Sequence, residues 1–216
     1  MIDIVRQAEA IQREVGEGHL PSGPARAIRL RRDYEAPIED VWDALTNPER
    51  IGRWFLPISG DYRLGGRYQF EGNAGGEIVA CDRPNRLKVT WVYGPDGEAD
   101  PSEVELRLSA LDAATTRFEL EHTAVVPEEM WSEYGPGAVG VGWDGGVLGL
   151  SLHLATGKTV DDPIAWQLSD EGREWTRRSS EAWGAANEAS GTDPAAAARG
   201  VANTINFYAP PPDETS

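Results

Sequence analysis

Residues 135–157, GPGAVGVGWDGGVLGLSLHLATG, decide how the rest of the chain is interpreted. At helical spacing this stretch is apolar on two sides. One face consists of Val139, Trp143, Val147, Leu150 and Leu154. The opposite face consists of Val141, Leu148 and Leu152. A helix that is apolar on two faces has to be covered on both. We therefore expect a helix held by a sheet on one side and by later chain on the other.

The same stretch spells G-x-G-x-x-G between Gly140 and Gly145. In a dinucleotide site this pattern directly follows a strand, and the helix N-terminus holds the pyrophosphate. Here the acidic stretch PEEMWSEY (127–134), which we expect to be a loop, precedes it, and no Lys or Arg stands nearby. Each glycine costs about 1 kcal/mol relative to alanine in a helix interior. We interpret the glycines as positions where sheet or tail approaches the helix closely.

The composition limits the class of protein. A length of 216 residues fits one domain with appendages, or two small domains. The chain has 20 basic and 36 acidic residues, so its net charge is −16. This charge repels phosphate backbones and anionic membranes, and we expect neither a nucleic-acid nor a membrane partner. Eight tryptophans suit both a core and the walls of a pocket.

Cysteine and histidine are scarce. Cys81 stands alone, so no disulfide framework is expected. The three histidines show no metal-ligand spacing, and we predict neither a metal nor a cofactor. The first residues lack the apolar core of a signal peptide, and no apolar run is long enough to cross a bilayer. A cytoplasmic location is the expectation.

The first half of the chain predicts a helix, a linker, a strand and two short helices, followed by a sheet. Residues 2–15 have helical spacing, residues 18–25 are interpreted as a linker, and 27–34 as a strand. Pro37 starts a helix, and Asn47-Pro48 starts a second one that ends near Trp54. Turn clusters then separate six further strands. They are 58–62, 66–71, 76–82, 86–93, 102–111 and 115–125, joined by hairpins into an antiparallel sheet.

Beyond residue 157 the sequence predicts a helical hairpin. Residues 161–172 are interpreted as a connector, within which Ser169 caps the next helix. Thr192-Asp193-Pro194 opens the last helix. This tail is too small to fold alone. It packs either on the outer face of the 135–157 helix or on a second subunit as a homodimer, and the sequence leaves both open.

Several segments together resemble one family. They are EAPIEDVWDALTNPERIGRWF (35–55), GDYRLGGRYQF (60–70), NRLKVTWVY (85–93), TRFELEHTA (116–124) and GW (142–143). They resemble the activator-of-heat-shock-protein-ATPase-like family of the SRPBCC superfamily. The resemblance implies an α+β, START-like helix-grip fold, in which a curved antiparallel sheet encloses a long helix. The helical tail is an addition to this pattern.

The resemblance also gives domain boundaries and a cavity. Residues 1–26 are expected to be an N-terminal helix and linker, 27–157 the START-like domain and 158–216 the helical extension. The fold implies a largely apolar cavity between sheet and helix, but no single activity. Members of the superfamily bind lipids, hormones and polyketides, and some catalyse cyclisation or hydrolysis. Nothing in residues 1–26 is long enough to be the separate N-terminal module with which the eukaryotic co-chaperones stimulate their chaperone, so we do not expect a chaperone-activating role.

The candidate ligand-binding residues are the side chains that we expect to face this cavity. They are Trp54, Phe55, Tyr68, Phe70, Trp91, Phe118, His122, Trp143 and Val147. Each could equally be plain core. His122 shares a strand face with Phe118 and Leu120, so it either shuttles a proton to a ligand or is a hydrogen-bonded core histidine. Polar groups expected at the rim are Glu77, Glu121, Tyr134 and Asp144.

These residues predict a binding protein. No catalytic constellation is present, so the main hypothesis is a carrier, sensor or sequestering protein for an apolar or aromatic small molecule. One alternative is a cyclase- or hydrolase-like enzyme using His122. Another is a co-chaperone-like interaction module whose acidic surface and tail contact a partner.

Overall fold

The computed structural model describes residues 2–93 and 102–211. Most of the turn predicted between the strands at 86–93 and 102–111 therefore lies outside the described residues. The chain forms two compact units. The first consists of Met1–Val15, Val126–Gly145 and Val160–Ser216, and the second of Gly16–Val125 and Gly146–Thr159.

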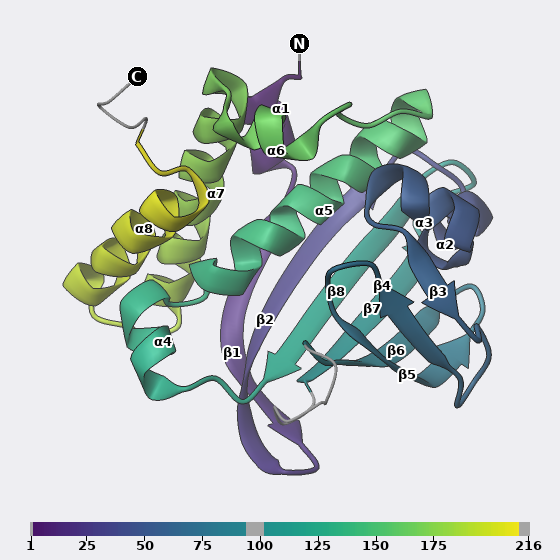
Figure 1. Cartoon of the computed structure of the whole chain (residues 1–216), viewed down its shortest axis with the longest axis horizontal. Coiled ribbons are helices and arrows are strands. Elements are labelled where there is room, and N and C mark those ends of the chain that lie inside the picture. Colours follow the sequence, from purple (N-terminus) through teal and green to yellow (C-terminus); the bar gives the residue numbers. More distant parts are fainter. Residues whose placement is uncertain (1, 94–101, 212–216) are drawn as a thin grey trace. The chain divides into compact units, whose positions relative to one another are not determined.

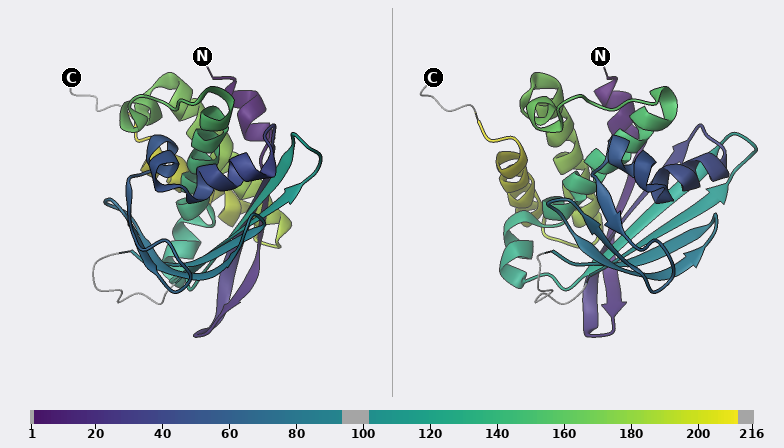
Figure 2. Two further views of the ribbon diagram at one scale, coloured as in Figure 1. Left: turned by 90° about the vertical axis from the view of Figure 1, so that its right-hand side faces the viewer. Right: turned by 45° about the vertical axis from the view of Figure 1, so that its right-hand side comes forward.

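An antiparallel sheet forms most of the second unit. Its eight strands have the order β1-β2-β8-β7-β6-β5-β4-β3. Their bounds are β1 (Gln12–Leu20), β2 (Gly23–Tyr34), β3 (Ile58–Gly60), β4 (Arg67–Phe70), β5 (Gly75–Asp82), β6 (Arg86–Trp91), β7 (Ser102–Ala110) and β8 (Thr116–Ala124). The sheet is strongly curved, with α2 (Ile38–Thr46) and α3 (Pro48–Trp54) above its concave side (Figure 2). The six strands expected between 58 and 125 and the two helices are confirmed.

Alternating side chains give the sheet one dry and one charged face. On β8, Phe118, Leu120 and His122 are buried on the inner face. The charged residues between them point outward and pair across strands. These outer pairs include Arg29–Glu121, Arg86–Glu105 and Lys88–Glu103. This is the pattern expected of an antiparallel sheet with one buried face.

Helix α5 (Gly137–Thr156) is the predicted long helix (Figure 1). Its residues from Gly146 onward belong to the second unit, where two hydrogen bonds tie them to β2. The Tyr34 hydroxyl donates to the carbonyl oxygen of Val147 at 3.1 Å, and Arg32 Nη2 donates to Ser151 Oγ at 2.8 Å. Gly149 lies against α3, since a Cβ there would come within 2.7 Å of the Trp54 carbonyl oxygen.

The first unit is helical and contains the predicted tail. Besides the start of α5 it comprises α1 (Ile4–Glu9), α4 (Glu128–Tyr134), α6 (Pro163–Leu168), α7 (Asp170–Ala189) and α8 (Pro194–Tyr208). The predicted caps are present, because Ser169 accepts from Gly172 N and Asp193 from Ala196 N. Gly140 packs directly against the ring of Trp183, so the tail lies on the beginning of α5.

Three predicted elements are wrong. The helix expected over 2–15 ends at Glu9, and residues 12–20 form β1 next to β2, so the expected linker is part of a hairpin. Strand pairing with β2 overrides the weak helical spacing there. Residues 128–134 and 163–168, expected in a loop and a connector, form α4 and α6. Both helices are too short for periodicity to show them. Their local signals are Pro127 before α4 and the side chain of Asp162, which caps α6.

Candidate functional site

Five aromatic side chains of the second unit form a continuous set of ring contacts, which we call the aromatic layer. Its members are Trp54, Phe55, Phe70, Tyr68 and Trp91. The ring centroids are 5.7 Å apart for Trp54–Phe55, 5.0 Å for Phe55–Phe70, 5.6 Å for Tyr68–Phe70 and 5.6 Å for Phe70–Trp91. Edge-to-face pairs such as Phe55–Phe70 are the favoured geometry of aromatic rings. The structure thus brings five of the predicted residues together.

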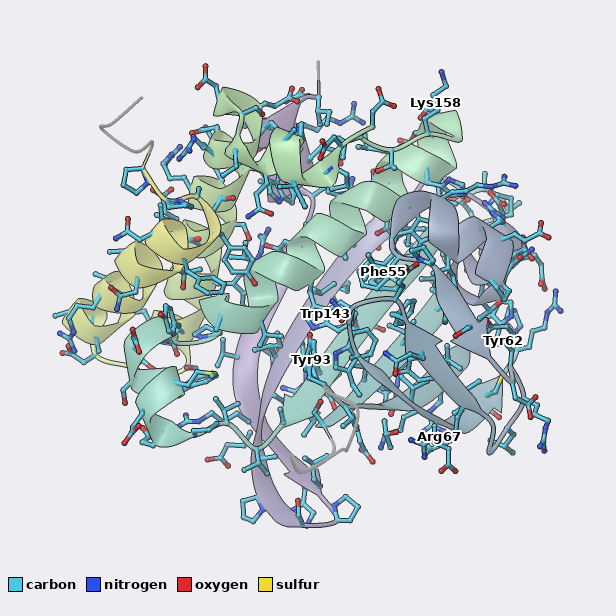
Figure 3. All side chains as sticks on the ribbon, in the orientation of Figure 1. Phe55, Tyr62, Arg67, Tyr93, Trp143 and Lys158 are labelled. Carbon is cyan, nitrogen blue, oxygen red and sulfur yellow. The ribbon has the colours of Figure 1, made fainter. Side chains whose placement is uncertain are left out.

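Local sequence explains this gathering. Tyr68 and Phe70 are two residues apart on β4, so both point to the inner face, and Trp91 lies at the end of β6. Phe55 directly follows α3 and is half-buried, as is Trp54, whereas Trp91 is only 6% exposed. Figure 3 shows Phe55 near α5, while Tyr62 and Arg67 lie toward the outer edge of the sheet. The layer therefore extends from partly exposed to buried rings.

Phe118 and Val147 lie beside Tyr34. The Phe118 and Tyr34 rings meet edge to face at 5.9 Å, and the Tyr34 hydroxyl bonds the Val147 carbonyl. All three residues are buried. Burial raises the pKa of Tyr34, so its hydroxyl stays protonated and keeps this bond. This second cluster fixes α5 on the sheet.

His122 is a hydrogen-bonded, neutral histidine. Its Nε2 lies 2.9 Å from Ser102 Oγ, and Ser102 Oγ donates to the carbonyl oxygen of Trp91 at 2.6 Å. The Ser102 hydroxyl uses its single proton in the hydrogen bond to the Trp91 carbonyl. In the bond between Ser102 and His122 the donor is therefore Nε2–H of the histidine. Burial lowers the pKa of His122 to about 4, so the ring is uncharged near pH 7. The chain His122–Ser102–Trp91 ties the histidine to the aromatic layer.

One buried cation on the inner face of the sheet was not predicted from the sequence. Arg32 is 6% exposed, and its guanidinium carbon lies 5.3 Å from the centroid of the Tyr34 ring. Its hydrogen bond to Ser151 ties it to α5. The strict alternation of Ile28, Leu30 and Arg32 was the signal that could have placed it inside. Ser102 was missed as well, because its role depends on its pairing opposite Trp91.

Trp143 and Asp144 are neighbours in the first part of α5. Trp143 belongs to the first unit, one helical turn before Val147. Its assignment to a ligand site stays a prediction. The prediction that polar groups line a rim is wrong for Asp144, which is fully buried and accepts from Arg13 Nε at 2.8 Å, Trp183 Nε1 at 3.2 Å and Ser179 Oγ.

The other three residues expected at the rim are also placed differently. Glu121 is on the outer face of the sheet with Arg29, and Glu77 is exposed opposite Arg67 on that face. Tyr134 packs against Phe207 in the first unit. Strand alternation turns the two glutamates to the outer face of the sheet, away from the aromatic layer.

The described residues contain neither a metal-binding group nor a membrane-spanning helix. Within 2–93 and 102–211, no three His, Cys, Asp or Glu side chains are grouped so that they could hold a metal ion. In the same part of the chain no helix is long and apolar enough to span a bilayer. The site is therefore described by its aromatic, histidine and arginine side chains.

The curved sheet around α5 defines a helix-grip protein. The family model described as "Activator of Hsp90 ATPase homolog 1-like protein" matches residues 35–146, just over half of the chain. The chain therefore belongs to this family, and the predicted family and fold class are confirmed. A comparison with curated proteins gives no match.

Solved structures agree with this assignment. The crystal structure of CalU16 from Micromonospora echinospora is 39% identical, with a TM-score of 0.65, over 82% of this chain and 98% of that one. The solution structure of CalU16 gives 37% and 0.67 over 84% and 97%. MLL2253 from Mesorhizobium loti, at 22% and 0.53 over 60% and 97%, shares the fold. The match to CalU16 extends beyond the family model, so the similarity includes part of the added helices.

Proposed function

We propose that the second unit binds an apolar or aromatic small molecule against the aromatic layer. The observation that carries the proposal is the unbroken series of ring contacts from half-buried Trp54 and Phe55 to buried Trp91. A ligand entering beside Phe55 would exchange solvent for aromatic surface, and burial of such surface is the main favourable term in binding apolar molecules.

The polar side chains near the layer define the ligand further. His122 is neutral near pH 7, so it does not require a charged ligand. The Tyr68 hydroxyl donates a hydrogen bond to the carbonyl oxygen of Thr90 at 2.7 Å. This leaves the Tyr68 ring as the binding surface. A flat, uncharged molecule with few polar groups fits these side chains. Membership in the family supports small-molecule binding in general, and within it we propose a carrier, sensor or sequestering role.

Binding of the uncharged fluorescent probe N-phenyl-1-naphthylamine tests this proposal. We expect saturable fluorescence enhancement with one site per chain, and a roughly tenfold weaker Kd in Phe55→Ala, because a buried aromatic side chain contributes about 1.5–3 kcal/mol. Ile164→Ala is the matched control, since Ile164 is 75% exposed on α6 of the first unit. Equal affinity of wild type, Phe55→Ala and Ile164→Ala would refute binding at the aromatic layer.

Native mass spectrometry addresses ligands that copurify with the protein. A captured small molecule should be present with the wild type and lost with Phe55→Ala. Trp143→Ala tests whether the preceding turn of α5 contributes, and retention of the ligand in that variant would remove Trp143 from the site. Retention in Phe55→Ala as well would contradict the proposal.

The alternative of an enzyme using His122 is less well supported. The Ser102 hydroxyl lies against Nε2, and burial lowers the pKa of the ring to about 4, so His122 is a weak base near pH 7. The binding role explains the same residues without requiring a proton shuttle.

A further inference from the structure

Helices α4 and α8 of the first unit present an exposed apolar surface, which we call the α4–α8 face. It consists of Met130, Tyr134 and Phe207. Met130 is 49% and Phe207 65% exposed, and the rings of Phe207 and Tyr134 meet at 5.9 Å. Met130 and Tyr134 are four residues apart on α4, so they share one side of that helix. We propose that this face docks a basic amphipathic helix of a partner protein.

The face is held in place by the backbone beneath it. Asn203 Nδ2 donates to the carbonyl oxygen of Glu133 at 2.8 Å, and Thr204 Oγ1 donates to that of Tyr134 at 3.3 Å. A Cβ on Gly200 would lie 3.1 Å from the same Tyr134 oxygen, so α8 and the end of α4 are in close contact. These contacts orient α4 although none of its residues is buried. A fixed, exposed surface loses little conformational entropy when a partner binds.

Charge identifies the partner. Helix α4 contains three exposed glutamates, Glu128, Glu129 and Glu133, whereas α8 contributes one exposed basic residue, Arg199. A methionine and two aromatic rings on a helix pair that has more carboxylates than basic groups suit a helix with apolar side chains on one face and Lys or Arg beside them. Opposite charges speed association and exclude partners of the wrong sign.

A second copy of the chain fits this face less well. Pairing two copies of the face would bring the glutamates of one copy toward those of the other, and like charges at an interface are unfavourable. On α7, Arg177 pairs with Glu174 and Glu181, and Arg178 pairs with Glu174. Within α4 and α8, Arg199 is a single basic residue against the three glutamates of α4, so two copies would have more like-charge than opposite-charge contacts at this face. The homodimer predicted as one option from the sequence is therefore an outcome to be tested.

Fluorescence anisotropy with a labelled synthetic Lys/Leu peptide of about 18 residues, long enough for a helix, tests the proposal. A peptide of the same composition with the amphipathic spacing scrambled, and a Glu/Leu peptide with the original spacing, are the probe controls. We expect binding of the amphipathic basic peptide, weaker binding of the scrambled one and none of the acidic one. Affinity should fall as salt is raised.

Matched variants locate the site on the protein. Phe207→Ala should weaken peptide binding roughly tenfold, as truncation of a central aromatic contact does, and Met130→Ala should weaken it less. Ile164→Ala, at a residue 75% exposed on α6 of the same unit, should change Kd by less than about twofold. Circular dichroism checks that each variant is folded. If Phe207→Ala does not fold, the effect of Met130→Ala on peptide binding tests the proposal instead.

Three results would overturn the proposal. The first is equal binding of scrambled and amphipathic peptides, or binding unchanged by both Phe207→Ala and Met130→Ala. The second is a doubled mass in light scattering that Phe207→Ala returns to the monomer, which would make the occupant a second copy. The third is Phe207-dependent binding to vesicles of anionic phospholipid, which would show that the α4–α8 face binds a membrane.

Discussion

Substituting Gly140 with alanine should destabilise the protein, although alanine is the better helix former. Gly140 lies in α5 against the indole ring of Trp183. An added Cβ would come within 2.5 Å of Trp183 Nε1, roughly 1 Å short of ordinary van der Waals contact. The ring has no room to retreat, because Trp183 is fully buried and its Nε1 donates to Asp144 Oδ2 at 3.2 Å.

The magnitude follows from two opposing terms. Overpacking a filled core costs typically about 1–3 kcal/mol. The change from glycine to alanine in a helix interior returns about 1 kcal/mol. Because the obstructing group is a rigid ring held by a buried carboxylate, we take the upper part of the range. The net loss for Gly140→Ala is then about 2 kcal/mol.

Gly145→Ala provides the matched control, since it makes the same change five residues later in the same helix. No atom lies within 4 Å of a Cβ at Gly145, so only the helix-propensity gain remains, about 1 kcal/mol of stabilisation. Thermal unfolding followed by far-UV circular dichroism should show a Tm lower by about 4–8 °C for Gly140→Ala and higher by about 2–4 °C for Gly145→Ala. If Gly140→Ala matches or exceeds the wild-type Tm, the close packing against Trp183 is refuted.

Two further predictions concern buried polar groups. Asp144→Ala leaves Arg13, whose side chain is 5% exposed, without its buried partner, and should lower the free energy of unfolding by about 3–5 kcal/mol in urea titrations; a loss below about 1 kcal/mol would contradict the buried ion pair. The pKa of His122 is lowered from 6.5 to about 4, so the unfolded chain takes up this proton first and the stability supplied by neutral His122 is lost as pH falls from about 6.5 to 4. His122→Gln keeps a donor to Ser102 but does not titrate, so wild type should lose about 3 kcal/mol more than this variant between pH 7 and pH 4. If the difference in the free energy of unfolding between the two proteins does not change with pH, the protonation of His122 is not coupled to folding.

The strands between residues 58 and 124 could be predicted because their signals are local. Turn residues separate them, and the alternation of Val104, Leu106 and Leu108 with charged neighbours is visible in one line of sequence. Strand β1 could not be predicted in the same way. Its residues form a strand because the edge of β2 is available for pairing, and that edge is a property of the folded sheet.

The same distinction between local and long-range signals applies to the candidate site. Tyr68, Phe70, Trp91 and Phe118 were predictable as inward-facing, since alternation on β4, β6 and β8 places them there. The link from His122 through Ser102 to Trp91 depends on register, with Ser102 opposite Trp91 and Val104 opposite His122. Asp144 shows the limit most clearly. Its partner Arg13 lies 131 residues away in the chain, and a single carboxylate among glycines gives no local sign of burial.

The glycines of α5 explain why a helix with such poor intrinsic propensity is stable. Gly140 and Gly137 let Trp183 of α7 and Thr204 of α8 approach its backbone, and Gly149 lets α3 approach on the sheet side. Each of these sites exchanges about 1 kcal/mol of helix propensity for contact that a Cβ would prevent. Gly145 has no such contact, so packing does not account for it. The same helix therefore contains glycines required by close approach and others, such as Gly145, that are not. The pair Gly140 and Gly145 separates the two causes by the sign of the change in stability.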